Sequence, residues 1–109
     1  MDFRKVTAII RPDYLEKVEQ ALQGLGVPGL SVTKVKGYGE YADFYTQDWM
    51  CTHVRVDVFI GQHRADQVAR AIMDAAHTGM IGDGIVAISP VETVYHIRTR
   101  QKCSFDACD

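Results

Sequence analysis

The hydrophobic pattern of this chain repeats: strand, helix and strand occur twice in succession, and few folds accommodate that order. Strands are predicted at residues 3–10, 30–38, 53–60 and 85–89, the last ended by Pro90, with a further short strand at residues 93–99. Helices are predicted between Pro12 and Gly26 and at residues 62–76. Because crossover connections are right-handed, the sheet becomes antiparallel with both helices on one face. The repeat therefore predicts an α+β fold, a ferredoxin-like βαββαβ sandwich.

Both predicted helices have one apolar face. In the first, the apolar positions are Leu15, Val18, Leu22 and Leu25; in the second they are Ala65, Val68, Ala69, Ile72 and Ala76. We expect these faces to cover one side of the sheet. The other side also carries apolar residues, among them Phe3, Ile9 and Phe59, and such a face is usually buried against further subunits.

The chain has 109 residues and a formal net charge of −2, which indicates one domain and gives no support for a nucleic-acid partner. No apolar run approaches the roughly 18 residues that a membrane helix requires, and the first residues lead into a strand without a signal-peptide core. We expect a cytoplasmic protein with no direct membrane insertion. The predicted domain covers residues 1–99, and residues 100–109 form a C-terminal tail without a periodic pattern.

Residues 39–51 fit neither a helical nor an alternating period, and we predict a loop there. Aromatic and acidic residues alternate irregularly from the end of the second strand; they are Tyr38, Glu40, Tyr41, Asp43, Phe44, Tyr45, Asp48 and Trp49. A loop of this composition is more often a contact surface for a partner than a solvated linker. The alternative is that the aromatics cover a small core of the loop itself or an oligomer contact.

The stretch Thr-Gly-Met-Ile-Gly-Asp-Gly at residues 78–84 is the densest in glycine. Glycine at this density indicates backbone with positive φ or a close approach by another group. A tight backbone with free N–H groups suits a phosphate or a carboxylate. The simpler interpretation is a helix C-cap followed by a turn into a strand.

Five segments in this order resemble the PII signal-transduction family. They are residues 8–12 (AIIRP), 29–39 (GLSVTKVKGYG), 78–84 (TGMIGDG), 89–92 (SPVE) and 97–99 (IRT). The resemblance implies a homotrimer of ferredoxin-like subunits that binds adenine nucleotides in clefts between neighbours. It also implies a regulatory protein, not an enzyme, whose loop between the second and third strands, the T-loop, controls a partner transporter or metabolic enzyme.

The resemblance implies nucleotide-binding roles for individual residues of this sequence. Ser31, Gly37, Tyr38 and Gly39 match the region near the base and ribose, and Phe59 matches the strand position whose backbone meets the adenine edge. Gly82, Asp83 and Gly84 match the loop that cradles phosphates. Arg98 matches an arginine that contacts a phosphate.

Three cations of the family pattern are absent from this sequence. Ile85 and His53 stand where the family has lysines, and His96 replaces the first of two arginines. Glu40-Tyr41 replaces Arg-Gln, whose glutamine helps to hold metal and 2-oxoglutarate in nitrogen-sensing members. Each charge-assisted hydrogen bond contributes about 1.5–3 kcal/mol, so triphosphate recognition should suffer most. We expect ADP or AMP to be favoured over ATP, with a second small anion as a possible co-ligand.

A second hypothesis is a metal-binding or metal-tolerance protein of the same architecture. It would use Cys51 and His53, which point the same way if their segment is extended, together with Cys103 and Cys108. Two ligands are a weak signal, since structural zinc sites normally have four, and the simpler interpretation is a surface histidine beside a half-buried thiol. The spacing of Cys103 and Cys108 also allows a small disulfide loop, although a reducing cytosol favours thiols.

Overall fold

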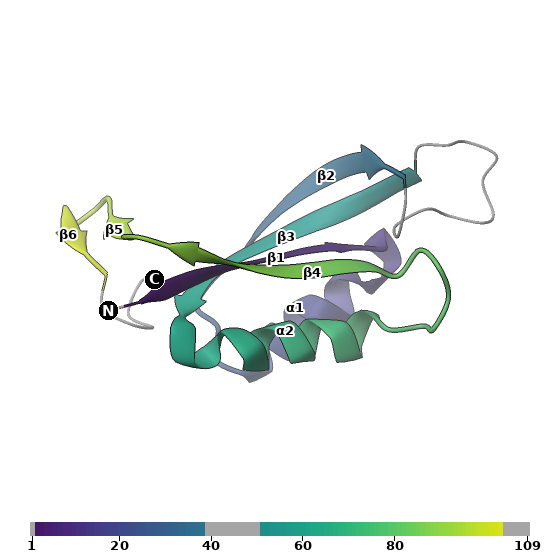
Figure 1. The fold of residues 1–109 in the computed structure, drawn as a ribbon, viewed down its shortest axis with the longest axis horizontal. Helices are drawn as coiled ribbons and strands as arrows, with labels where there is room; N and C mark the ends of the chain where they lie inside the picture. Colours follow the sequence, from purple (N-terminus) through teal and green to yellow (C-terminus); the bar gives the residue numbers. More distant parts are fainter. Residues whose placement is uncertain (1, 39–50, 104–109) are drawn as a thin grey trace.

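A four-stranded sheet with two helices on one face forms the body of the protein. The computed structural model describes residues 2–38 and 51–103. In chain order, its elements are β1 (Phe3–Ile10), a 3-10 turn η1 (Pro12–Tyr14), α1 (Leu15–Gly24), β2 (Ser31–Gly37), β3 (Cys51–Gly61), α2 (Gln62–Ala76), β4 (Gly84–Val91), β5 (Tyr95–His96) and β6 (Gln101–Lys102). Figure 1 shows α1 and α2 side by side beneath the sheet.

The strand order in the sheet is β2-β3-β1-β4, and every neighbouring pair is antiparallel. This is the ferredoxin-like arrangement that the repeated pattern predicts. In the register, Ile10 at the end of β1 lies opposite both Val54 and Gly84. The end of β1, the beginning of β3 and the beginning of β4 therefore meet at one end of the sheet.

The core lies between the sheet and the helices. On α2 the predicted apolar face is buried throughout, and on α1 the residues Val18 and Leu22 are buried. They pack against alternate residues of the central strands, namely Val6, Ala8, Ile10, Val54, Val56, Val58 and Ile60. On the open face, Phe59 is exposed and Ile9 is half-buried. Phe3 differs from the prediction, because only 3% of it is exposed in the single subunit.

The elements differ from the predicted ones mainly near the C-terminus. Strand β4 continues through Pro90 to Val91, with Pro90 opposite Arg4. Within the described sheet β4 is an edge strand, and there a proline costs no ladder hydrogen bond. Residues 101–102, predicted to lack regular structure, pair with β5 instead. The resulting β5–β6 hairpin projects from the end of β4, away from the body of the sheet (Figure 1).

Neither helix in the described ranges is long and apolar enough to span a membrane. The aromatic residues predicted for the T-loop, from Tyr41 to Trp49, lie outside the described residues, as do Glu40 and Cys108.

Candidate functional site

The glycine-rich stretch forms a tight loop between α2 and β4. Gly79, Gly82 and Gly84 have φ values of 86°, 108° and 105°, which side chains other than glycine rarely adopt. At Gly84 a Cβ atom would lie 1.7 Å from the carbonyl oxygen of Ile9. Helix α2 ends at Ala76 with an extended His77, so the glycines do not form a simple helix C-cap. The loop backbone itself requires them.

The carboxylate of Asp83 closes the loop from inside. It accepts hydrogen bonds from the backbone N–H groups of Thr78 at 2.8 Å and Gly79 at 3.0 Å, and from the Thr78 hydroxyl. Arg11 Nε lies 3.4 Å from the same carboxylate. Burial by itself would raise the pKa of Asp83, but the hydrogen bonds from Thr78, Gly79 and Arg11 outweigh it and lower the pKa to about 2. Asp83 is therefore an ionised part of the loop scaffold.

Two side chains hold the carbonyl groups of the loop. Arg11 Nη2 donates to the Ile81 oxygen at 3.0 Å, and His53 Nε2 lies 3.1 Å from the Gly82 oxygen. Because a carbonyl oxygen can only accept, Nε2 of His53 carries a hydrogen in this contact. Only 2% of His53 is exposed, which corrects the simpler interpretation of a surface histidine. The loop is thus held by the residue that follows β1 and by a residue near the beginning of β3.

The predicted nucleotide-binding residues fall into two groups in a single subunit. The first group lies at the loop end of the sheet and contains Gly37, Tyr38, Gly82, Asp83 and Gly84. Gly39 belongs to the same stretch of chain but lies outside the described residues.

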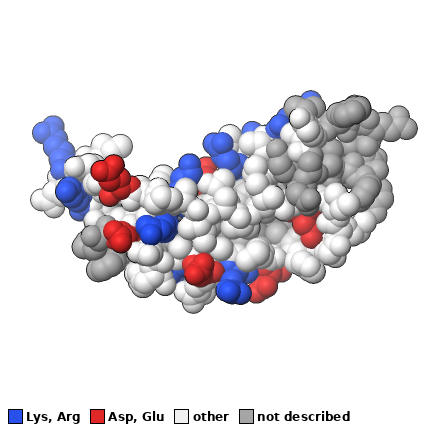
Figure 2. Space-filling model, viewed as in Figure 1, with Lys and Arg blue, Asp and Glu red and all other residues white. Residues whose placement is uncertain are grey.

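The second group lies farther from the loop, between the middle of the sheet and its other end. Ser31 is opposite Asp57, and Phe59 is opposite Lys5. Arg98 lies in the turn of the β5–β6 hairpin, which Figure 1 shows at the end remote from the loop between α2 and β4. Strand β4 alone separates this loop from the hairpin by about 23 Å at ~3.3 Å per residue. At the hairpin end, Figure 2 shows Lys and Arg side chains next to Asp or Glu side chains.

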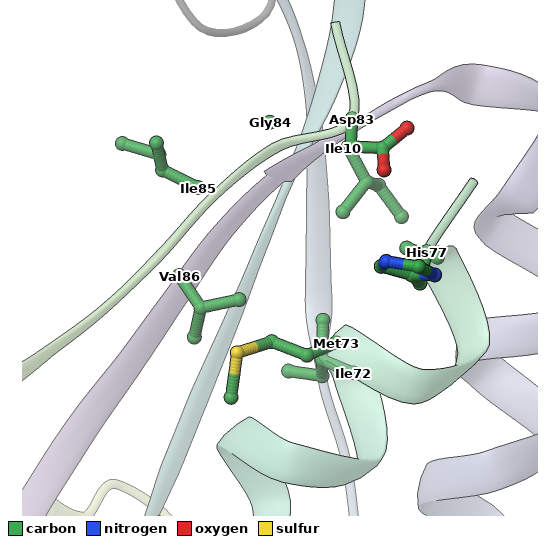
Figure 3. A pocket seen from close by; sticks show the side chains of 9 residues that line it. Ile10, Ile72, Met73, His77, Asp83, Gly84, Ile85 and Val86 are labelled. Carbon is green, nitrogen blue, oxygen red and sulfur yellow. The ribbon is translucent and has the colours of Figure 1, made fainter. Parts of the chain in front are cut away.

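The side chain at one of the positions where a cation is missing, Ile85, brings no charge to the loop. Ile85 is exposed, and it extends to the side of β4 opposite Val86, which extends toward Met73 and Ile72 (Figure 3). An isoleucine offers no donor to a phosphate. Among the described residues, the nearby Arg11 is already paired with Asp83.

An apolar pocket lies on the helix side of the loop. It has a volume of about 220 Å³ and is lined by residues of α2, including Ile72 and Met73, and by Gly84 and Val86 of β4 (Figure 3). Its lining is mostly apolar but also includes His77 and the ionised Asp83. A pocket with one carboxylate and mostly apolar side chains does not suit a phosphate.

The metal hypothesis gains no support from the described residues. They contain no group of three or more His, Cys, Asp or Glu side chains that could hold a metal ion. Nε2 of His53 is already used by Gly82, and the Cys51 side chain is not described. Cys103 is disulfide-bonded, whereas Cys108 lies outside the described residues.

Sequence reasoning assigned no role to Arg11 or Thr78. Both residues stand in segments that resemble the PII family, 8–12 and 78–84, and the partner of Arg11, Asp83, is far away in sequence. A signal was present: a cation directly after β1 and an aspartate directly before β4 are neighbours once these strands pair.

Both the sequence and the fold are similar to those of known proteins. Residues 3–101 match the family model "Nitrogen regulatory protein P-II". The chain is 36% identical over 107 residues to a nitrogen regulatory protein P-II from Azospirillum brasilense, an alignment that covers 91% of this chain and 95% of the relative. It is 39% identical over 101 residues to the nitrogen regulatory protein GlnK of Escherichia coli (strain K12), covering 86% and 90%. The crystal structure of Arabidopsis thaliana PII bound to citrate superimposes with a TM-score of 0.83 at 32% identity, covering 94% of this chain and 90% of that one.

Proposed function

Because this chain belongs to the nitrogen regulatory protein P-II family, we propose that it is a regulatory homotrimer that binds an adenine nucleotide between subunits. The nucleotide controls a partner protein, a transporter or a metabolic enzyme, through the T-loop at residues 39–51. The proposed site combines both groups of predicted residues, each contributed by a different subunit.

The separation of the two groups is the observation that supports this proposal most strongly. The phosphate loop at residues 78–84 and Arg98 lie at opposite ends of one subunit, farther apart than one nucleotide can reach. A head-to-tail arrangement brings the loop of one copy to the hairpin of the next, and such heterologous contacts can close into a ring. The hairpin itself supports the arrangement, because an isolated two-stranded hairpin is marginally stable and 93% of Ile97 in its turn is exposed.

The charge balance at the loop supports ADP or AMP over ATP. Ile85 supplies no cation, Arg11 is paired with Asp83, and His53 is turned inward to Gly82. The loop can offer backbone N–H groups, while positive charge comes from Arg98 of the neighbouring copy. Each added phosphate brings further negative charge to a site with few cations. A second small anion belongs to the proposal as well, since the similar Arabidopsis protein was crystallised with citrate.

Titration calorimetry with adenosine, AMP, ADP and ATP tests this assignment, together with sedimentation analysis of the wild type. We expect a trimer that binds ADP at least as tightly as ATP. Arg98→Ala should weaken ADP binding about 10- to 100-fold, the loss of one charge-assisted hydrogen bond, and leave adenosine binding nearly unchanged. Lys102→Ala, which removes a charge from β6 of the same hairpin, is the matched control and should have little effect.

Three outcomes would count against the proposal. ATP binding tenfold tighter than ADP would contradict the predicted phosphate preference. Equal losses in Arg98→Ala and Lys102→Ala would indicate a general charge effect instead of a specific contact. A monomer at micromolar concentration, or a trimer that binds none of the four compounds, would overturn the intersubunit nucleotide site.

A further inference from the structure

The peptide groups on either side of Gly82 can face in two directions, and two side chains decide which. Glycine tolerates both signs of φ, so the Ile81–Gly82 and Gly82–Asp83 peptides could rotate at little intrinsic cost. In one orientation their carbonyl oxygens face the surface, and in the other they face the protein. The observed orientation faces inward, with Arg11 bound to the Ile81 oxygen at 3.0 Å and His53 to the Gly82 oxygen at 3.1 Å.

The direction of each carbonyl group also determines the direction of the N–H group in the same peptide. In a trans peptide the C=O and N–H bonds are antiparallel, so the N–H group of Gly82 points away from Arg11. The Asp83 N–H group points away from His53 and lies 3.4 Å from the Met80 oxygen. With both carbonyl oxygens already bound by side chains, the loop presents fewer free acceptors to an approaching anion. Free carbonyl oxygens would repel that anion, whereas N–H groups would attract it.

We propose that Arg11 and His53 act together as a carbonyl clamp, a pair of positioning residues that keeps the loop in its anion-binding orientation. The inference rests on the proposed function in taking the anion to be a nucleotide phosphate. In this chain the clamp supports anion binding indirectly: neither residue needs to touch the phosphate. His53 contributes from within β3, three residues before Val56 of the core, and its burial fixes the position of its ring.

The clamp also explains the different environments of the two substituted positions. Ile85 faces the open side of the sheet, where it does not contact a loop carbonyl in any described hydrogen bond. His53, by contrast, lies within hydrogen-bond distance of a loop carbonyl, the Gly82 oxygen. A neutral donor is sufficient for that contact, because the group it holds is an uncharged carbonyl.

Four variants test the clamp by calorimetry with ADP and adenosine. His53→Leu removes the donor while keeping an apolar side chain in the buried site, and Arg11→Met removes the other half of the clamp. Each should weaken ADP binding by up to about tenfold, in the range of one lost ordinary hydrogen bond, with adenosine changed less than about twofold. His53→Gln retains an N–H donor at a similar reach and should recover most of the ADP affinity. His77→Leu, an exposed histidine beside the same loop, is the control and should bind as the wild type does.

A role in folding alone predicts a different pattern. In that case His53→Leu and Arg11→Met would lower ADP and adenosine affinity equally, or would lower the melting temperature without changing either affinity, and the clamp would be overturned. If His53→Leu does not fold, Arg11→Met and His53→Gln still decide the question.

A titration with inorganic pyrophosphate, followed by the amide NMR signal of Gly82, separates this inference from the nucleotide assignment. If the wild type binds no nucleotide but its Gly82 signal shifts with pyrophosphate, and that shift is lost in His53→Leu, the clamp stands and the nucleotide function fails. If ADP binds equally to wild type and His53→Leu, the clamp fails and the nucleotide function stands. A Gly82 signal that responds to neither ADP nor pyrophosphate would overturn the clamp.

Discussion

Replacing Gly84 by alanine should be among the most damaging single-methyl changes in this protein. The new Cβ atom would lie 1.7 Å from the Ile9 oxygen and 2.8 Å from the Ile9 carbonyl carbon. Both are backbone atoms of the central strand β1, so no side chain can rotate to make room. The contact must open to at least 3.0 Å, the lower limit of real Cβ contacts, and β4 can reach that only by moving away from β1 at the Ile10–Gly84 pair.

The expected cost follows from two contributions. The positive φ of 105° at Gly84 costs an alanine about 1–2 kcal/mol. Separating the strand ends forfeits one or two backbone hydrogen bonds, at roughly 1 kcal/mol each. Together these lower the free energy of unfolding by about 2–4 kcal/mol, and at ~4 °C per kcal/mol for a domain of this size the melting temperature falls by about 8–16 °C.

Gly79→Ala is the matched control for this experiment. Gly79 has a φ of 86°, but its nearest atom to a new Cβ is Cε1 of the His77 side chain at 3.8 Å. It carries the conformational cost without the steric one, so we expect a loss of only about 1–2 kcal/mol. Urea unfolding and calorimetry at one fixed protein concentration measure both variants, because association shifts the apparent stability. Equal losses in the two variants would refute the argument that strand contact with Ile9 makes glycine necessary at position 84.

Three further predictions concern single residues. The pKa of Asp83 in the folded state is lowered to about 2. Its ionised form therefore contributes about 2 kcal/mol at most to the free energy of unfolding above about pH 4–5, and this contribution is lost as the pH falls toward 2. Asp83→Asn should abolish that part of the pH dependence in urea unfolding between pH 2 and 6, and a parallel decline in variant and wild type would argue against it. Ile72→Ala, at a fully buried site, should cost about 2–5 kcal/mol of unfolding free energy, whereas Met73→Ala at the exposed neighbouring position should cost less than about 1 kcal/mol. Ile85→Lys should shift the nucleotide preference toward ATP in titration calorimetry, while Ile88→Lys, an equal charge farther along β4, should not; a shift in both would indicate long-range attraction only.

The regular elements were predictable because each is determined by local periodicity. The apolar spacing of α2 and the alternation of β3 depend on neighbours within a few residues. The extension of β4 through Pro90 was not predictable in this way, since a proline is tolerated there only because of the position of β4 in the sheet. The pairing of β5 with β6 was missed for a related reason: two-residue strands carry almost no periodic signal.

In the candidate site, too, the features set by nearby residues were predictable and the contacts between distant residues were not. The glycines at residues 78–84 predicted backbone with positive φ or a close approach by another group. At Gly84 the structure shows both, a φ of 105° and the nearby Ile9 carbonyl. The contacts that shape the loop come from elsewhere, from Arg11 after β1 and His53 in β3, and no local pattern connects them. The resemblance had identified His53 as a lost lysine, but only the fold shows which carbonyl it holds.

The strand order has a consequence for the synthesis of this protein. Strand β1 is synthesised first, yet it lies between β3 and β4. Both edges of β1 are paired only after Gly61 and Val91, the partners of Phe3, have been made. At about 5–20 residues per second, a ribosome leaves this apolar strand without its second neighbour for several seconds. During that time the nascent chain has a β-forming segment with unsatisfied edges and no stable domain to contain it. We expect the emerging N-terminal half to bind chaperones, and the fold to close only after residues 84–91 have left the exit tunnel.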